Sequence, residues 1–125
     1  MKPFIITTLL FAAAACSTVE EPPIDEQLAE LGYVISAGNE RIPNIRIRGW
    51  SEINDRNLIV SAGMQDKYLI ELRSNCINLQ GAFSVAFSSN NRVARIDKFE
   101  SLYVRGPGRR VERCNIRNIY RLIAV

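Results

Sequence analysis

Residues 57–74 read NLIVSAGMQDKYLIELRS and lie in the middle of the strand-forming part of the chain. Two runs rich in β-branched, aromatic and other apolar residues, NLIVSAG at 57–63 and KYLIELRS at 67–74, flank the short connection MQD. Strand-like runs joined by a few residues are typical of a β-hairpin. The stretch therefore predicts two neighbouring antiparallel strands.

Strand-like runs continue on both sides of this hairpin with a period of two residues. In NIRIRGW, for example, Ile45 and Ile47 alternate with Arg46 and Arg48. The further runs are NIRIRGW at 44–50, AFSVAFSS at 82–89, RVARI at 92–96, SLYVRG at 101–106 and RVERCNIRNIYRLI at 110–123. Six or seven short strands at this spacing suggest a small antiparallel barrel or a strongly curled sheet.

A single helix is expected ahead of the strands, over IDEQLAELGYVIS at 24–36. The apolar residues that share one helical face are Ile24, Leu28, Leu31, Val34 and Ile35. Pro22 and Pro23 precede this segment and Gly38 follows it, as suits helix boundaries, although Gly32 weakens a helix by about 1 kcal/mol relative to Ala. The predicted fold is mainly β, of the α+β class, with one N-terminal helix.

The first 15 residues have the character of a signal peptide. Lys2 supplies one positive charge, and residues 4–15 form an uncharged, mostly apolar run of twelve residues. This run is shorter than the about 20 residues that span a bilayer as a helix, and it ends in small residues, as a cleavage site requires. One interpretation is cleavage near Ala15 and a soluble exported protein. In the other, AAAC at 13–16 resembles the lipobox of bacterial lipoproteins, and Cys16 is acylated.

The residues after Cys16 favour acylation over a soluble product or a buried cytoplasmic segment. STVEEPPIDE is polar, acidic and proline-bearing, which suits a tether, and two or more acyl chains give stable anchoring. Asp at position 17 would mark retention in the inner membrane. Ser17 instead resembles the sorting signal for the outer membrane. We expect a signal peptide at 1–15, a lipidated tether at 16–23 and one β-rich domain at 24–125, facing the periplasm from the outer membrane, with a soluble periplasmic protein as the alternative.

Cys76 and Cys114 are expected to form a disulfide that staples this domain. Export places them in an oxidising compartment, where such a pair more often bridges than stays reduced. The chain contains no histidine, so two thiols alone would make a poor metal site. We therefore expect neither a metal nor a cofactor.

No catalytic pattern stands out, and we expect no enzyme. The lack of histidine removes His-assisted nucleophiles. GPG at 106–108 precedes a strand-like run rather than a helix, so it fits a turn better than a phosphate loop. The carboxylate pairs Glu52 with Asp55 and Asp97 with Glu100 could act as acid and base, but solvated turn residues explain them better.

The C-terminal third of the chain is basic. Residues 92–125 carry nine basic and three acidic residues, whereas residues 17–56 carry four basic and eight acidic ones. Arginines recur at every fourth position, at Arg105, Arg109, Arg113, Arg117 and Arg121. A step of four returns to the same face of a strand, so the last three are expected to share one face. Cys114, Ile116, Tyr120 and Leu122 are then expected to point into the core.

Two interpretations of these arginines remain open. They form a solvent face that blunts a sheet edge or pairs with the acidic leader, or they bind an anionic envelope component such as lipid headgroups, lipopolysaccharide phosphates or glycans. Nucleic acid is not expected, because it does not fit the compartment and only Tyr103 and Tyr120 lie near the arginines as stacking aromatics. Trp50 is interpreted as a core residue.

Four segments resemble a family of small Gram-negative envelope lipoproteins catalogued only as a domain of unknown function. The segments are GWSEINDRNLIV, YLIELRSNC, IDKFESLYV and RCNIRNIYRL, within residues 45–122. In that family a Gly-Trp, a strand ending at a cysteine, a Phe-centred segment and a final cysteine strand recur in this order, matched here by Trp50, Cys76, Phe99 and Cys114. The resemblance implies the disulfide and the exported location, and no activity.

Together these observations predict an exported, lipid-anchored envelope protein that acts by binding or structural support. The membrane is its expected partner through the N-terminal lipid, and no partner protein is indicated. The alternatives are a receptor for an anionic small molecule or glycan that uses the arginine-rich face, and an uncharacterised enzyme.

Overall fold

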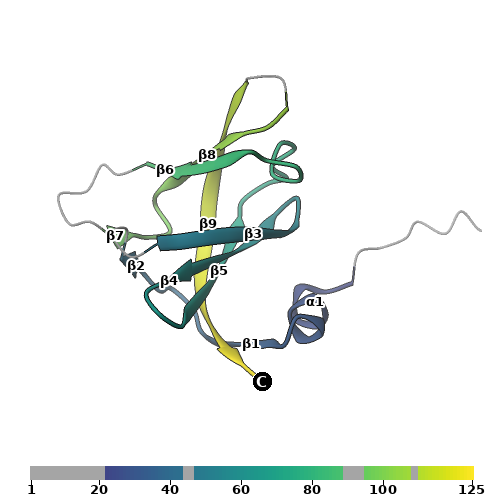
Figure 1. Cartoon of the computed structure of the whole chain (residues 1–125), viewed down its shortest axis with the longest axis vertical. Helices are drawn as coiled ribbons and strands as arrows, with labels where there is room; N and C mark the ends of the chain where they lie inside the picture. Colours follow the sequence, from purple (N-terminus) through teal and green to yellow (C-terminus); the bar gives the residue numbers. More distant parts are fainter. Residues whose placement is uncertain (1–21, 44–46, 89–94, 108–109) are drawn as a thin grey trace, which may run out of the picture.

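The computed structural model describes residues 22–43, 47–88, 95–107 and 110–125, and within these ranges it contains one helix and nine strands (Figure 1). The helix is α1 (Ile24–Glu30). The strands are β1 (Tyr33–Ala37), β2 (Ile42–Pro43), β3 (Ile47–Asn54), β4 (Asn57–Ala62), β5 (Asp66–Leu72), β6 (Ser84–Phe87), β7 (Arg95–Ile96), β8 (Ser101–Arg105) and β9 (Val111–Ala124).

The main sheet is a nearly closed antiparallel barrel. Its strand order is β3-β4-β5-β9-β8-β6, and β2 and β7 form a separate two-stranded sheet. The predicted mainly β fold, with a small barrel, one N-terminal helix and a disulfide, is confirmed. The predicted hairpin at 57–74 is the pair β4 and β5, aligned from Asn57 opposite Glu71 to Ala62 opposite Asp66.

Strand β9 connects most of the fold. Figure 1 shows this strand (yellow) crossing the molecule along its length. One edge pairs with β5, and the other pairs first with β8 and then, at its C-terminal end, with β1. Because three strands depend on its hydrogen bonds, the register of β9 sets where their side chains lie.

Two apolar clusters cover the two faces of the sheet. The cluster inside the barrel includes Leu58, Val60, Tyr68, Ile70, Leu72, Leu102, Val104, Cys114, Ile116 and Ile119. The cluster on the outer face joins Leu28 of α1 to Ile59, Leu69 and Leu122. Strand β4 is apolar on both faces because both are covered, which explains its continuous run LIV. The half-buried Trp50 packs against the barrel cluster, as predicted.

The helix is shorter than the sequence pattern predicts. It ends at Glu30, and Gly32 has a φ of 87°, a left-handed conformation that glycine adopts without steric cost. Val34 and Ile35 then lie in β1, opposite residues of β9. The prediction of helix over 31–36 is therefore wrong, because pairing with β9 satisfies the backbone of this segment better than helical spacing does.

Candidate functional site

The predicted disulfide between Cys76 and Cys114 is confirmed. Their Cα atoms are 5.9 Å apart, within the usual range for a bridge, and both residues are buried. Cys114 lies in β9 opposite Leu102, whereas Cys76 opens the turn that follows β5. The backbone N–H of Cys76 also donates to the carbonyl of Asp55 at 2.7 Å. The bridge therefore fastens this turn to the last strand of the barrel.

Glu112 holds the same turn through its carboxylate. Its Oε1 accepts the N–H of Asn78 at 2.9 Å, and its Oε2 accepts the N–H of Ile77 at 3.4 Å. With Cys76 and Cys114 it forms a group of three metal-ligating residue types within 4.8 Å. A metal binds a cysteine as a thiolate, and these two sulfurs are bonded to each other. The group therefore serves the fold.

We expect a Glu112→Ala variant to lower the free energy of unfolding by about 1–3 kcal/mol, because two backbone N–H groups lose their acceptor. Glu112→Gln keeps one amide oxygen and is expected to lose less. Urea denaturation followed by circular dichroism measures both, with Glu52→Ala on the exposed surface of β3 as the control. Equal stability of Glu112→Ala and wild type would show that the carboxylate does not hold the turn.

A β-bulge in β9 changes which side chains share a face. Opposite β5, Ile116 faces Leu72 and Asn118 faces Glu71, so Arg117 is an extra residue between them. An extra residue of this kind shifts the alternation of the strand by one position. Beyond the bulge, Ile119 therefore points into the barrel, although the unbroken pattern predicts otherwise.

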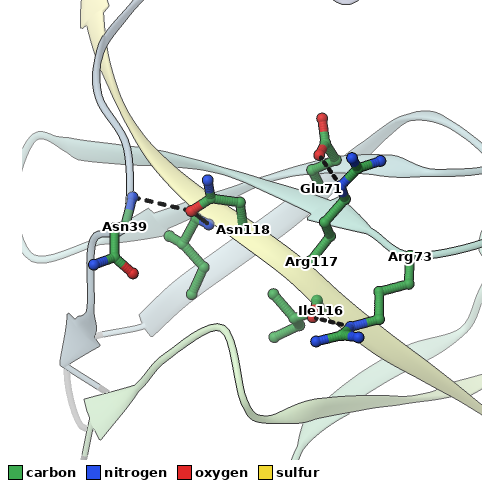
Figure 2. A network of polar contacts seen from close by, with 7 residues as sticks. Asn39, Glu71, Arg73, Ile116, Arg117 and Asn118 are labelled. Carbon is green, nitrogen blue, oxygen red and sulfur yellow. Dashed lines mark hydrogen bonds and ion pairs between the residues drawn. The ribbon is translucent and has the colours of Figure 1, made fainter.

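Side chains on both edges of β9 hold this bulge (Figure 2). The Oδ1 of Asn118 accepts the N–H of Asn39 at 2.9 Å and the N–H of Ile119 at 2.8 Å. On the other edge, Arg73 Nε donates to the carbonyl of Ile116 at 3.2 Å. The backbone groups that the bulge removes from the regular ladder thus find partners nearby.

The prediction that Arg113, Arg117 and Arg121 share one face is wrong. Residues directly opposite one another in a sheet point to the same face. Arg113 lies opposite the exposed Tyr103 on the outside of the barrel, whereas Arg121 lies opposite Tyr68, which belongs to the barrel cluster. The bulge at Arg117 separates the two and inverts their orientation.

The prediction that Cys114, Ile116, Tyr120 and Leu122 all point into one core is only partly right, because of the same inversion. Cys114 and Ile116 lie in the barrel cluster, as expected. Leu122 lies instead in the outer cluster with Leu28 of α1, and Tyr120 packs against that cluster. The strand thus contributes apolar side chains to both clusters, one on each side of its bulge.

The arginines of β9 have polar partners. Arg117 Nε lies 3.5 Å from Glu71 Oε1, and Arg121 Nη2 lies 3.1 Å from Asp66 Oδ1. Arg113 Nε donates to the hydroxyl of Ser101 at 3.2 Å. Arg105 is exposed at the end of β8, and Arg109 lies outside the described residues. These partners lie in β5 and β8 and not in the acidic segment 17–56, and β9 is paired on both edges, so neither form of the solvent-face interpretation describes the contacts of these arginines.

Tyr68 lies near the Arg121–Asp66 ion pair at one end of the barrel. Burial raises the pKa of its phenol, and the guanidinium of Arg121 offsets part of that increase. A phenol with a raised pKa stays protonated at neutral pH. Tyr68 therefore contributes apolar packing and no negative charge.

Asp97 and Glu100, one of the two predicted carboxylate pairs, lie in one turn and do not face one another across a cleft. Asp97 Oδ1 accepts the N–H of Phe99 at 2.9 Å, and the carbonyl of Asp97 accepts the N–H of Glu100 at 3.1 Å, so both belong to one turn. Glu100 is buried, and its carboxylate accepts the hydroxyl of Ser88 at 2.7 Å. The interpretation of Glu100 as a solvated residue is wrong, because this turn packs against the end of β6.

A polar cleft of about 310 Å³ lies between α1 and the turn that joins β3 to β4. Within it, Asn54 Nδ2 donates to Gln27 Oε1 at 3.2 Å. Asn54 Oδ1 accepts the N–H of Arg56 at 2.9 Å and Nδ2 of Asn57 at 3.0 Å. The Oδ1 of Asn57 is buried without a hydrogen-bond partner among the described residues. These amides tie α1 to the hairpin.

A larger groove of about 490 Å³ lies on the outer face of the sheet beside α1. Gly49, Ser61 and Lys67 lie opposite one another in one row across β3, β4 and β5. The next row contains Ser51, followed by Ile59, which the helix covers. The groove is lined by Leu31, Tyr33, Gly49, Trp50, Ser51, Ile59, Ser61 and Lys67. The small residues Gly49 and Ser61 in the first row leave this space open.

Sequence reasoning did not single out this groove. The alternation in 57–74 places Ile59 and Ser61 on one face, which is a local signal. That Gly49 and Lys67 complete the row depends on the register of three strands. A search for small residues at alternate positions of adjacent predicted strands would have found Gly49, Ser51 and Ser61.

Comparisons with known proteins place the chain in a family. No helix in the described ranges is long and apolar enough to cross a membrane. Neither the curated proteins nor the solved structures contain a match to the chain. A family model with the description "Family of unknown function (DUF6491)" matches residues 1–124. The chain therefore belongs to DUF6491, a family of unknown function.

Proposed function

We propose that this protein is an exported, lipid-anchored domain of the Gram-negative cell envelope that acts by binding or structural support. The observation that carries the proposal is the buried disulfide between Cys76 and Cys114. Disulfides persist in oxidising compartments and are rare in the cytosol. The signal-peptide character of residues 1–15 supports the same location.

Anchoring through Cys16 keeps the domain close to a membrane. The seven residues 17–23 separate Cys16 from the start of α1. Even fully extended, they span at most about 25 Å. The expected partner is therefore the lipid bilayer, and the outer membrane is the expected location. The anchored barrel can then contact other envelope components near that membrane.

Several polar side chains have structural partners, which supports a non-catalytic role. Asp97 and Glu100 are engaged in a turn, Glu112 holds the loop next to the disulfide, and two arginines are paired with carboxylates. The chain has no histidine to act as a proton shuttle. Binding or structural support requires only the surfaces and the stapled fold.

We expect Cys16→Ser to release the protein from membranes. Wild-type protein is expected in the membrane fraction and to incorporate labelled fatty acid, whereas the variant appears in the soluble fraction without label, because the thiol that carries the acyl chain is gone. Fractionation and mass spectrometry of the N-terminus measure this. A Cys76→Ser, Cys114→Ser variant serves as the control and keeps the label. Wild-type protein that is soluble with an unmodified N-terminus would contradict anchoring.

A further inference from the structure

The groove beside α1 combines an apolar wall with an open floor. Leu31 is 54% exposed and Tyr33 is half-buried, and both line the groove together with Ile59. A Cβ atom built on Gly49 meets no other heavy atom within 4 Å. Apolar groups that entered this space would remove Leu31 and its neighbours from water, which is favourable in proportion to the area buried.

A half-buried cation lies along the same groove. The ammonium of Lys67 donates to the hydroxyl of Ser61, and within the described ranges Lys67 forms no ion pair with a carboxylate. An adjoining cleft of about 290 Å³ shares Gly49, Ser61 and Lys67 with the groove and is bordered by the exposed Arg48. Asp66 also lines that cleft, and its carboxylate is bonded to Arg121.

We infer that this groove binds an anionic amphiphile, a molecule with one carboxylate and an apolar body. The carboxylate would accept hydrogen bonds from Lys67 and Ser61, and the apolar body would cover Leu31 and Tyr33. Charge complementarity at the partly desolvated Lys67 selects an anion over a neutral molecule. The volume of about 490 Å³ lies within the usual range of small-molecule sites.

This inference rests on the proposed binding role and names its ligand class. Monomeric laurate is the probe, and dodecanol, with the same chain and a neutral head, is its comparison. The protein is the mature chain that the proposed cleavage leaves, residues 16–125, with Cys16→Ser, so that neither an acyl group, nor the apolar run at 4–15, nor detergent competes. Isothermal titration calorimetry measures binding, because the only tryptophan, Trp50, packs its side chain against the barrel cluster and is no direct reporter of the groove.

Laurate is expected to bind at least tenfold more tightly than dodecanol. Lys67→Met keeps the apolar stem and removes the charge, and it should weaken laurate binding by about ten- to hundredfold, since hydrogen bonds to charged groups are the strong ones. Dodecanol binding should not change. Lys98→Met is the matched control, because Lys98 lies over the ring of Phe99 and does not line the groove.

Equal affinity for laurate and dodecanol, or unchanged laurate binding by Lys67→Met, would overturn the inference. Binding to phosphatidylglycerol vesicles without binding of monomeric laurate would overturn it too, in favour of a membrane-contacting surface. Gly49→Leu, which fills the floor, is expected to abolish binding of both probes at an unchanged melting temperature. If that variant unfolds, Lys67→Met still decides. Failure of laurate binding would leave the Cys16 fractionation result standing.

Discussion

A Cys76→Ala, Cys114→Ala variant is expected to lose about 4 kcal/mol of the free energy of unfolding. The two cysteines are 38 residues apart in sequence, and the chain-entropy model assigns roughly this cost to opening a loop of that length. The loop between Cys76 and Cys114 contains β6, β7 and β8. The melting temperature should fall by on the order of 20 °C.

Thermal and urea denaturation followed by circular dichroism test this expectation. Wild-type protein with a reductant should behave like the double variant, which separates loss of the bridge from loss of the buried sulfurs. A double variant within about 1 kcal/mol of wild type would contradict the role of the disulfide as a staple of this fold.

The second large effect is expected from Ile119→Ala, which should cost about 2–5 kcal/mol because it leaves a cavity in a packed core. Ile119 is fully buried opposite Ile70 inside the barrel. Ile123→Ala is the matched control, because it is the same substitution in the same strand, four residues after Ile119. Because Ile123 is 51% exposed, its truncation should cost less than about 1 kcal/mol.

This pair of variants tests the bulge in β9. Unbroken alternation from Cys114 would put Ile119 and Ile123 on the side away from the barrel cluster, with Tyr120 and Leu122 inside it. The bulge at Arg117 brings Ile119 into the barrel instead. Chemical denaturation gives the two free energies, and similar small losses from both variants would contradict the register described above.

Local signals in the sequence were sufficient for much of the fold. The two runs in 57–74 and the short connection between them predict β4 and β5, because a hairpin is decided by residues close together in sequence. The start of α1 follows from Pro22 and Pro23. Predicting the disulfide between Cys76 and Cys114 requires no knowledge of the strand register, because they are the two cysteines that follow Cys16.

Long-range pairing decided the remaining features. Val34 and Ile35 fit the helical spacing of the predicted helix, yet they lie in a strand because the edge of β9 offers this segment hydrogen bonds. The arginines at every fourth position lose their common face because β5 and the Asn39 segment hold a bulge at Arg117 and Asn118. The groove floor exists because Gly49, Ser61 and Lys67 meet in one row of three strands. A sequence pattern records the period of one segment, whereas the register between segments comes from the packing of the whole sheet.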